Sequence, residues 1–170
     1  MNKHSLNSPS NFARRIQCPG SANAERGMVE EPSVYAAEGT AAHKLGENCL
    51  TDGLDPQDMI GRVIDGFEVD SEMADAVAIY VNYCRDLIDD AVVFGVEDHL
   101  PLLFLGKDDK GTSDFNAVTT RRVLYAVDFK YGKGIPVDVV ENVQGLCYGL
   151  GTARKYDNHA WDQMVIVIIQ

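Results

Sequence analysis

The sequence predicts an α/β fold whose elements follow one another in the order α-α-β-β-β-α-β. Apolar residues recur at helical spacing across residues 71–94, which indicates one long amphipathic helix. The segment Val123–Val127 is apolar on both faces, as is typical of a strand inside a sheet. A second helical pattern, residues 138–156, separates that strand from a last apolar strand, Met164–Ile169.

The helices before the sheet are predicted from packing and capping patterns. A short helix is expected at residues 11–16, and a longer one at residues 34–50 with small residues on its packing side: Ala36, Ala37, Ala41, Ala42 and Leu45. An Asp-Gly and an Asp-Pro pair make residues 51–66 a predicted loop. In the helix at 71–94, Ser71 is the expected N-cap and Gly95 the expected end, and its apolar face consists of Met73, Val77, Tyr80, Cys84, Leu87 and Ile88.

Three strands are predicted at residues 96–105, 112–118 and 122–130, where apolar residues are frequent. A Gly-rich loop at residues 131–136 leads into the last helix, 138–156. The packing side of that helix is expected to be formed by its bulky apolar residues, Val139, Val143, Leu146 and Leu150.

The length of 170 residues is enough for one domain with a hydrophobic core. We expect residues 1–10 to be disordered and residues 11–170 to form that domain. Because a buried strand rarely closes a protein abruptly, the apolar run at 164–169 indicates that the chain is truncated at its C-terminus or continues beyond Gln170.

Composition excludes some classes of protein. No stretch reaches the roughly 18–20 apolar residues that a membrane span needs, and the polar N-terminus lacks the apolar segment of a signal peptide. The four cysteines are scattered without a CxxC pair, which favours reduced thiols over disulfides; a cluster ligated by all four is the less favoured alternative. We therefore expect a cytoplasmic protein, inside a bacterial host cell if the gene is phage-borne.

The net charge of −11 counts against nucleic-acid binding, because a phosphate backbone normally requires a basic surface. Acidic residues that hold divalent cations can nevertheless present positive charge to a phosphate. Several basic residues also lie close together in sequence: Arg121, Arg122, Lys130 and Lys133.

The strand at 122–130 ends with two charged residues on one face. Side chains alternate along a strand, so Asp128 and Lys130 share a face. If the strands at 112–118 and 122–130 form a hairpin centred on Arg121, Asp114 lies directly across from Asp128. The register could also slip by one residue, because residues 119–122 do not dictate a turn type. Two opposed carboxylates repel each other unless a divalent cation lies between them, and Lys130 would then stabilise charge on a phosphate or orient the attacking water. A solvated hairpin, with Lys130 in a salt bridge to either aspartate, is the simpler alternative.

These residues carry a resemblance to a known superfamily. Gly111-Thr112-Ser113-Asp114 followed by Asp128-Phe129-Lys130 resembles the active-site pattern of the PD-(D/E)XK nucleases. Gln144 and Tyr148 resemble the QxxxY motif of the RecB-like and lambda-exonuclease-like branch, and His43 resembles the histidine motif of RecB-like members. Together these motifs cover most of the chain. Their combination resembles that of superfamily members encoded by phages or prophages.

The resemblance implies a restriction-endonuclease-like core, with a mixed central β-sheet flanked by helices. It implies that Asp114, Asp128 and the carbonyl of Phe129 bind Mg²⁺ or Mn²⁺, that His43 completes the metal site, and that Lys130 is the catalytic lysine. Gln144 and Tyr148, on one helical face, would contact DNA or support the site. Three further candidates are weaker: Lys133 in a cationic loop, Glu47 four residues after His43, and Glu97, for which a solvated strand end is the simpler interpretation.

The function expected from these residues is Mg²⁺- or Mn²⁺-dependent hydrolysis of DNA. An exonuclease in phage DNA recombination, repair or processing is implied by the resemblance rather than by the site chemistry. DNA is the expected partner, with a helicase or a single-strand annealing protein as further candidates. The alternatives are a non-catalytic DNA-binding or assembly module of the same fold, and a metal hydrolase acting on another phosphoester.

Overall fold

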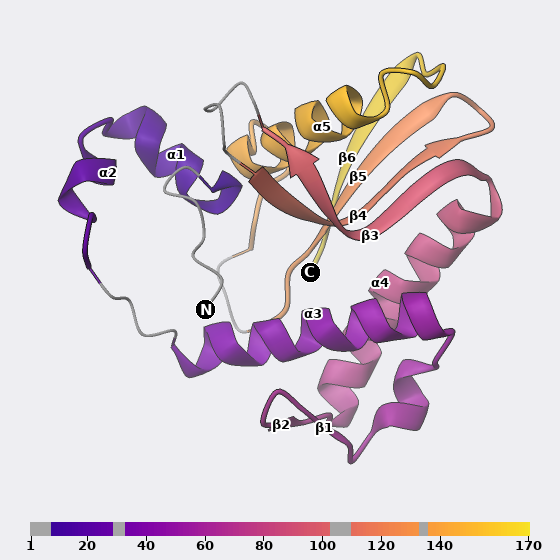
Figure 1. The fold of residues 1–170 in the computed structure, drawn as a ribbon. Helices are drawn as coiled ribbons and strands as arrows, with labels where there is room; N and C mark the ends of the chain where they lie inside the picture. The colour runs from indigo at the N-terminus through magenta and orange to yellow at the C-terminus, as the bar shows by residue number, and fades with distance from the viewer. Residues whose placement is uncertain (1–7, 29–32, 103–109, 133–135) are drawn as a thin grey trace.

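A four-stranded mixed sheet forms the centre of the molecule, with helices on both faces (Figure 1). The computed structural model describes residues 8–28, 33–102, 110–132 and 136–170. Strand order in the sheet is β3-β4-β5-β6. The first three strands pair antiparallel, and β6 joins β5 parallel after the crossover through α5. The predicted α/β class and the mixed central sheet flanked by helices are confirmed.

The elements occur in the following order: α1 Pro9–Gln17, α2 Ser21–Ala24, α3 Val34–Asp52, η1 Pro56–Met59, β1 Val63–Ile64, β2 Phe67–Glu68, α4 Ser71–Asp89, β3 Ala91–Pro101, β4 Lys110–Thr119, β5 Val123–Phe129, α5 Val143–Lys155 and β6 Gln163–Ile169. Without the short elements and α1, this is the predicted order α-α-β-β-β-α-β.

Helices α3 and α4 cover one face of the sheet. Their buried residues pack against Phe115, Ala117, Val127 and Phe129, which alternate along β4 and β5. The predicted apolar face of α4 is confirmed, since Met73, Val77, Tyr80, Cys84 and Leu87 are all buried. The Tyr80 ring stacks on Phe129 with centroids 4.9 Å apart and lies against Gly46 of α3, where a Cβ atom would come within 3.0 Å of it. The end of β5 is therefore packed against α3 and α4 on this face of the sheet.

Helix α5 covers the opposite face, but through a different side than the sequence predicts. Its buried residues are Gly145, Cys147, Tyr148, Gly149, Gly151 and Thr152, whereas Leu146 and Leu150 are about half exposed. A Cβ on Gly145 would lie 2.7 Å from Cγ2 of Ile166 in β6. The helix approaches the sheet so closely that only small residues fit between them, and the bulky residues therefore point away.

The register of β4 and β5 is the one predicted. Phe115 pairs with Val127 and Val118 with Leu124, so the same register extended by one residue sets Asp114 opposite Asp128. Strand β5 lies between β4 and β6, which confirms that the strand apolar on both faces is an interior one.

Several predicted boundaries are wrong. Helix α4 ends at Asp89, and Ala91–Phe94 belong to β3 because they pair with β4; Gly95 therefore lies inside a strand. Strand β3 ends at Pro101, one residue before Leu102, which is not in a strand; residues 103–105 of the predicted strand lie outside the described residues. The last helix begins at Val143 rather than at residue 138, since the side chain of Asn142 caps it by accepting from the amide of Gly145 at 2.8 Å.

Short elements account for the other differences. Asp70, not Ser71, caps α4 by accepting from the amide of Met73. The predicted loop at 51–66 contains η1 and β1, and β1 pairs with β2. Helix α1 begins at Pro9, so residues 8–10 are ordered against prediction, while residues 1–7 lie outside the described part of the chain.

All four cysteines are free, as expected. Cys49 and Cys84 are buried between α3 and α4, whereas Cys147 belongs to α5 on the other face of the sheet. A cluster ligated by all four is thereby excluded. Among the described helices, none is both long and apolar enough to cross a membrane.

Candidate metal centre

The pairing of β3, β4 and β5 is interrupted where the candidate site lies. The β3–β4 register pairs Val96 with Phe115 and Asp98 with Ser113, so Glu97 and Asp114 occupy opposed positions. On the other side of β4, Oδ2 of Asp114 accepts the backbone amide of Phe129 at 2.6 Å. A carboxylate thus takes the place of a carbonyl at the end of the β4–β5 ladder, which fixes Asp114 against the strand that carries the Asp-x-Lys motif.

Glu97 has an unusual backbone for a residue within a strand. Its φ is +45°, in the left-handed region that residues other than glycine rarely adopt. Such a conformation costs about 1–3 kcal/mol and persists only where the surroundings enforce it. We call this left-handed position in β3 the kink; the Glu97 carboxylate at it lies 3.8 Å from Nδ1 of His43 on α3.

His43, Glu97 and Asp114 converge from three separate elements. Nδ1 of His43 lies 3.4 Å from Oδ1 of Asp114 and 3.8 Å from Oε1 of Glu97. Asp114 is buried, and the other two side chains are 29% exposed. One ligand atom from each residue lies within 4.8 Å of the other two. The cluster is therefore compact yet open to solvent.

The pKa of His43 is raised to about 10. Burial by itself lowers this pKa, but hydrogen bonding and charge attraction from Asp114 and Glu97 outweigh the burial. At neutral pH, with no cation bound, His43 is an imidazolium that partly neutralises the two carboxylates.

Lys130 and Asp128 form the second half of the site. The ammonium of Lys130 lies 2.9 Å from Oδ2 and 3.0 Å from Oδ1 of Asp128, the salt bridge foreseen as an alternative. Gln144 on α5 accepts from Lys130 at 3.3 Å and donates to Asp128 at 3.4 Å and to the Tyr148 hydroxyl at 3.2 Å. The predicted placing of Gln144 and Tyr148 on one helical face is confirmed. Gln144 contacts the Asp128–Lys130 pair, and Tyr148 contacts Gln144.

The pKa of Asp128 is raised to about 6. Burial is the main cause, the nearby charge of Asp114 adds to it, and Lys130 and His43 oppose it. Asp128 thus lies close enough to Asp114 and His43 to interact with both charges, although its hydrogen bonds are to Lys130 and Gln144.

The structure separates the weaker candidates. Glu97 belongs to the cluster and lies inside β3, so the prediction of a solvated strand end is wrong. Glu47 instead pairs with Lys44 at 2.6 Å on the surface of α3. The carbonyl of Phe129 as a ligand stays a prediction, and Lys133 lies outside the described residues.

The basic residues that cluster in sequence do not cluster in space. Arg121 and Arg122 lie at the turn before β5 and pair with Asp90 and Asp162. Lys130 follows the other end of the same strand, roughly 25 Å away at about 3.3 Å per residue. No continuous basic patch is formed by these three residues.

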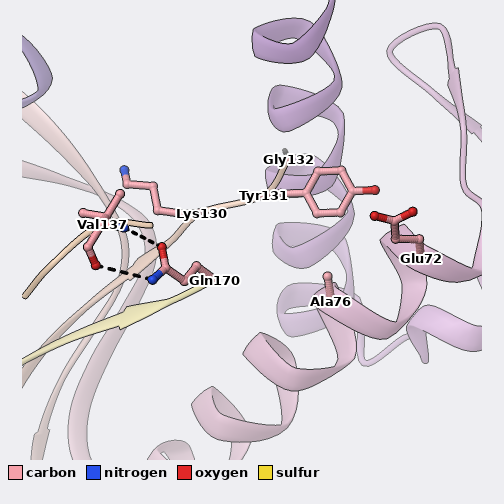
Figure 2. A pocket seen from close by; sticks show the side chains of 7 residues that line it. All are labelled: Glu72, Ala76, Lys130, Tyr131, Gly132, Val137 and Gln170. Carbon is pink, nitrogen blue, oxygen red and sulfur yellow. Dashed lines mark hydrogen bonds between the residues drawn. The ribbon is translucent and has the colours of Figure 1, made fainter. Parts of the chain in front are cut away.

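A cavity of about 340 Å³ adjoins Lys130 (Figure 2). Its walls come from α4, the end of β5 and the C-terminal residue Gln170, which exchanges hydrogen bonds with the backbone of Val137. Figure 2 shows the Tyr131 ring extending toward Glu72 on the far wall. None of the three cluster residues lines this cavity, whereas Lys130 both lines it and pairs with Asp128.

A hard divalent cation fits the donor set of the cluster. Two carboxylates are ligands that suit Mg²⁺ and Mn²⁺, and a neutral imidazole is a common ligand of transition-metal ions. Two metal–ligand bonds of about 2.1 Å span at most about 4.2 Å, which covers the distances of 3.4 and 3.8 Å from Nδ1 of His43 to the two carboxylates. His43 must lose its proton before it can bind a metal.

Comparison with known proteins gives a family. No solved structure is a significant match to this chain. Residues 4–170 match a family described as a protein of unknown function, DUF2800. Since the match covers nearly the whole sequence, the chain belongs to the DUF2800 family.

Proposed function

We propose that this protein is a Mg²⁺- or Mn²⁺-dependent deoxyribonuclease. The observation that carries the proposal is the convergence of His43, Glu97 and Asp114 from α3, β3 and β4, beside the Asp128–Lys130 pair. A buried aspartate paired with a lysine at the end of an interior strand is costly for a purely structural role. Their arrangement is the one expected for phosphodiester hydrolysis.

The protein residues divide this chemistry between them. His43, Glu97, Asp114 and Asp128 would hold the cation, which when bound lowers the pKa of a coordinated water and polarises the phosphate. Lys130 stabilises negative charge on the phosphate or orients the water. Water adds to phosphorus, one P–O ester bond breaks, and the water proton passes to the solvent or the leaving oxygen, which gives a phosphomonoester and an alcohol.

Gln144 and Tyr148 hold this pair in place in the proposed site. Gln144 contacts both Asp128 and Lys130, so it would keep Lys130 near the reacting phosphate if Asp128 held a cation. DNA contact by either residue is part of the proposal.

The finer assignments rest on the sequence resemblance. A restriction-endonuclease-like core agrees with the mixed sheet and its flanking helices. The dependence on DNA ends, and a role in phage DNA recombination, repair or processing beside a helicase or an annealing protein, follow from similarity to the RecB-like and lambda-exonuclease-like branch.

The test is cleavage of end-labelled linear and covalently closed circular DNA, single- and double-stranded, with Mg²⁺, Mn²⁺ or EDTA. We expect metal-dependent loss of linear DNA with circles spared. Asp128→Ala and Lys130→Ala should each reduce the rate by about 100-fold or more, because each removes a group that stabilises the transition state. Glu47→Gln, the nearby carboxylate paired with Lys44, is the matched control and should keep wild-type activity.

Other outcomes separate the alternatives. Cleavage of circular DNA would support nuclease activity but reject the dependence on DNA ends. Cleavage of nucleotides or other phosphoesters but not DNA would indicate a different metal hydrolase. Metal-independent DNA binding without cleavage, unchanged in both variants, would indicate a non-catalytic binding module.

A further inference from the structure

A network of polar side chains lies next to Glu97, on the face of the sheet that α5 covers. The ammonium of Lys155 pairs with Oδ1 of Asp98, and Nδ2 of Asn116 donates to Oδ2 of Asp98 at 3.1 Å. The Tyr156 hydroxyl donates to Oδ1 of Asn116 at 2.8 Å. Both carboxylate oxygens of Asp98 are thereby held, one by a charged and one by a neutral donor.

Three members of this hydrogen-bonded network are largely protected from solvent, whereas Lys155 at its edge is 33% exposed. Asn116 is fully buried, Tyr156 is 5% exposed, and the side chain of Asp98 is 16% exposed. The buried Tyr156–Asn116 hydrogen bond is costly to lose because its polar groups would be left without partners, whereas the Lys155–Asp98 pair lies at the edge. This network, which we call the attachment, therefore connects β3, β4 and the C-terminal end of α5.

Asp98 is the residue that follows Glu97, so the attachment acts on the kink directly. A left-handed residue needs neighbours that enforce its conformation. The Asp98 side chain folds back over Gly95, where an added Cβ would lie 2.5 Å from Oδ2 of Asp98. Glycine at position 95 thus leaves the space in which Asp98 reaches Lys155 and Asn116.

We propose that Asp98, held by Lys155 and Asn116 over Gly95, is a positioning device that keeps Glu97 in its left-handed conformation and its carboxylate in the His43–Asp114 cluster. This inference rests on the proposed function, because it takes Glu97 to be one of the metal ligands. Lys155 and Asp98 touch neither the cation nor the substrate; they act through Glu97 alone.

The experiment is a double-mutant cycle on Mn²⁺ affinity, measured by electron paramagnetic resonance of free Mn²⁺. Lys155→Met removes the cationic end of the attachment, and its side chain is one-third exposed, so the fold should survive. We expect about tenfold weaker Mn²⁺ binding, the usual effect of losing a residue that orients a ligand. In a Glu97→Gln background the same substitution should change the affinity by less than about twofold, because the residue it acts through has lost its charge.

Two further variants sharpen the test. Arg154→Met is the matched control, since Arg154 is the adjacent cation of α5 and pairs with the exposed Asp157; it should leave Mn²⁺ affinity unchanged. Gly95→Ala displaces Asp98 without removing any charge and should weaken binding in the same direction as Lys155→Met.

A second readout does not depend on the metal. Backbone chemical shifts of residue 97, in EDTA, should report a left-handed conformation in the wild type and its loss in Lys155→Met. Unchanged Mn²⁺ affinity and unchanged shifts in Lys155→Met would overturn the inference, as would an equal effect in the Glu97→Gln background. If the wild type binds no Mn²⁺ at all, the proposed metal site fails, and the chemical shifts still decide whether the attachment holds Glu97.

Discussion

At the scale of single residues, His43 and Asp128 both hold protons more tightly than usual, for different reasons. The pKa of His43 is raised to about 10 because two carboxylates outweigh the effect of burial. The pKa of Asp128 is raised to about 6 chiefly by burial. The metal-free site therefore takes up protons where a bound cation would otherwise supply the positive charge.

Stability of the metal-free protein should fall as the pH rises from about 7 to 10. The folded pKa of His43 lies above its unfolded value, so the folded state binds more protons and loses stability as they dissociate. The slope from this one group is at most about 1.4 kcal/mol per pH unit. Urea denaturation in EDTA across this range measures it. His43→Gln should flatten the profile, and an equally steep profile in that variant would show that another group is responsible.

Binding of Mn²⁺ near pH 7.5 should release close to one proton per ion. His43 is almost fully protonated at this pH and must be neutral to coordinate a metal, so affinity should also rise with pH. Calorimetry in two buffers with different ionisation enthalpies counts the protons. The release should nearly vanish in His43→Gln; full release in that variant would place the proton on a different residue.

At the scale of elements, α5 connects the two halves of the site. Gln144 in its first turn contacts Asp128 and Lys130, and Lys155 in its last turn holds Asp98 beside Glu97. The helix can do both because small residues allow it to lie close against the sheet. Its distance from the strands is therefore part of the site geometry.

Gly145→Ala should destabilise the protein by about 1–3 kcal/mol, the usual effect of overpacking a core, despite the better helix propensity of alanine. The added Cβ would meet Cγ2 of Ile166 at 2.7 Å. Leu146→Ala is the matched control: this neighbour is 49% exposed and its truncation should cost less than about 0.5 kcal/mol. Chemical denaturation compares the two. The reverse order of effects would mean that the leucine face, as the sequence predicts, packs on the sheet.

At the scale of the whole molecule, the net charge of −11 gives little attraction for DNA. Many of the described cations are already paired with carboxylates: Arg14, Arg15, Lys44, Arg121, Arg122, Lys130, Arg154 and Lys155. A bound divalent cation would be the main positive charge offered to a phosphate.

Divalent cations should raise the melting temperature, because the ligands come from α3, β3 and β4 and assemble only in the folded chain. At 100 times the dissociation constant the stabilisation is about 2.7 kcal/mol, or roughly 5–10 °C for a domain of this size. Thermal unfolding with Mn²⁺ or EDTA measures the shift. Glu97→Gln and Asp114→Asn should reduce it and Glu47→Gln should not; a shift that survives in both ligand variants would reject this site.

The sequence alone determined the order of the main elements and the interior position of β5. It offered the register that opposes Asp114 and Asp128 as one of two, one residue apart, and the structure selected it. The element order and the place of β5 follow from local rules: side-chain alternation along a strand and helical periodicity. The Asp-x-Lys spacing and the Gln144–Tyr148 spacing lie within single elements, so their shared faces could also be predicted.

Only the tertiary structure decided the rest. Glu97 joins the site because Asp98 is anchored to a helix almost 60 residues away in sequence, a contact that no local pattern encodes. Ala91–Phe94 form a strand because β4 offers partners for their hydrogen bonds, which outweighs the helical pattern. The buried face of α5 depends on how closely Ile166 approaches Gly145. Long-range packing fixes these features, and periodicity within one segment carries no information about the neighbour it will meet.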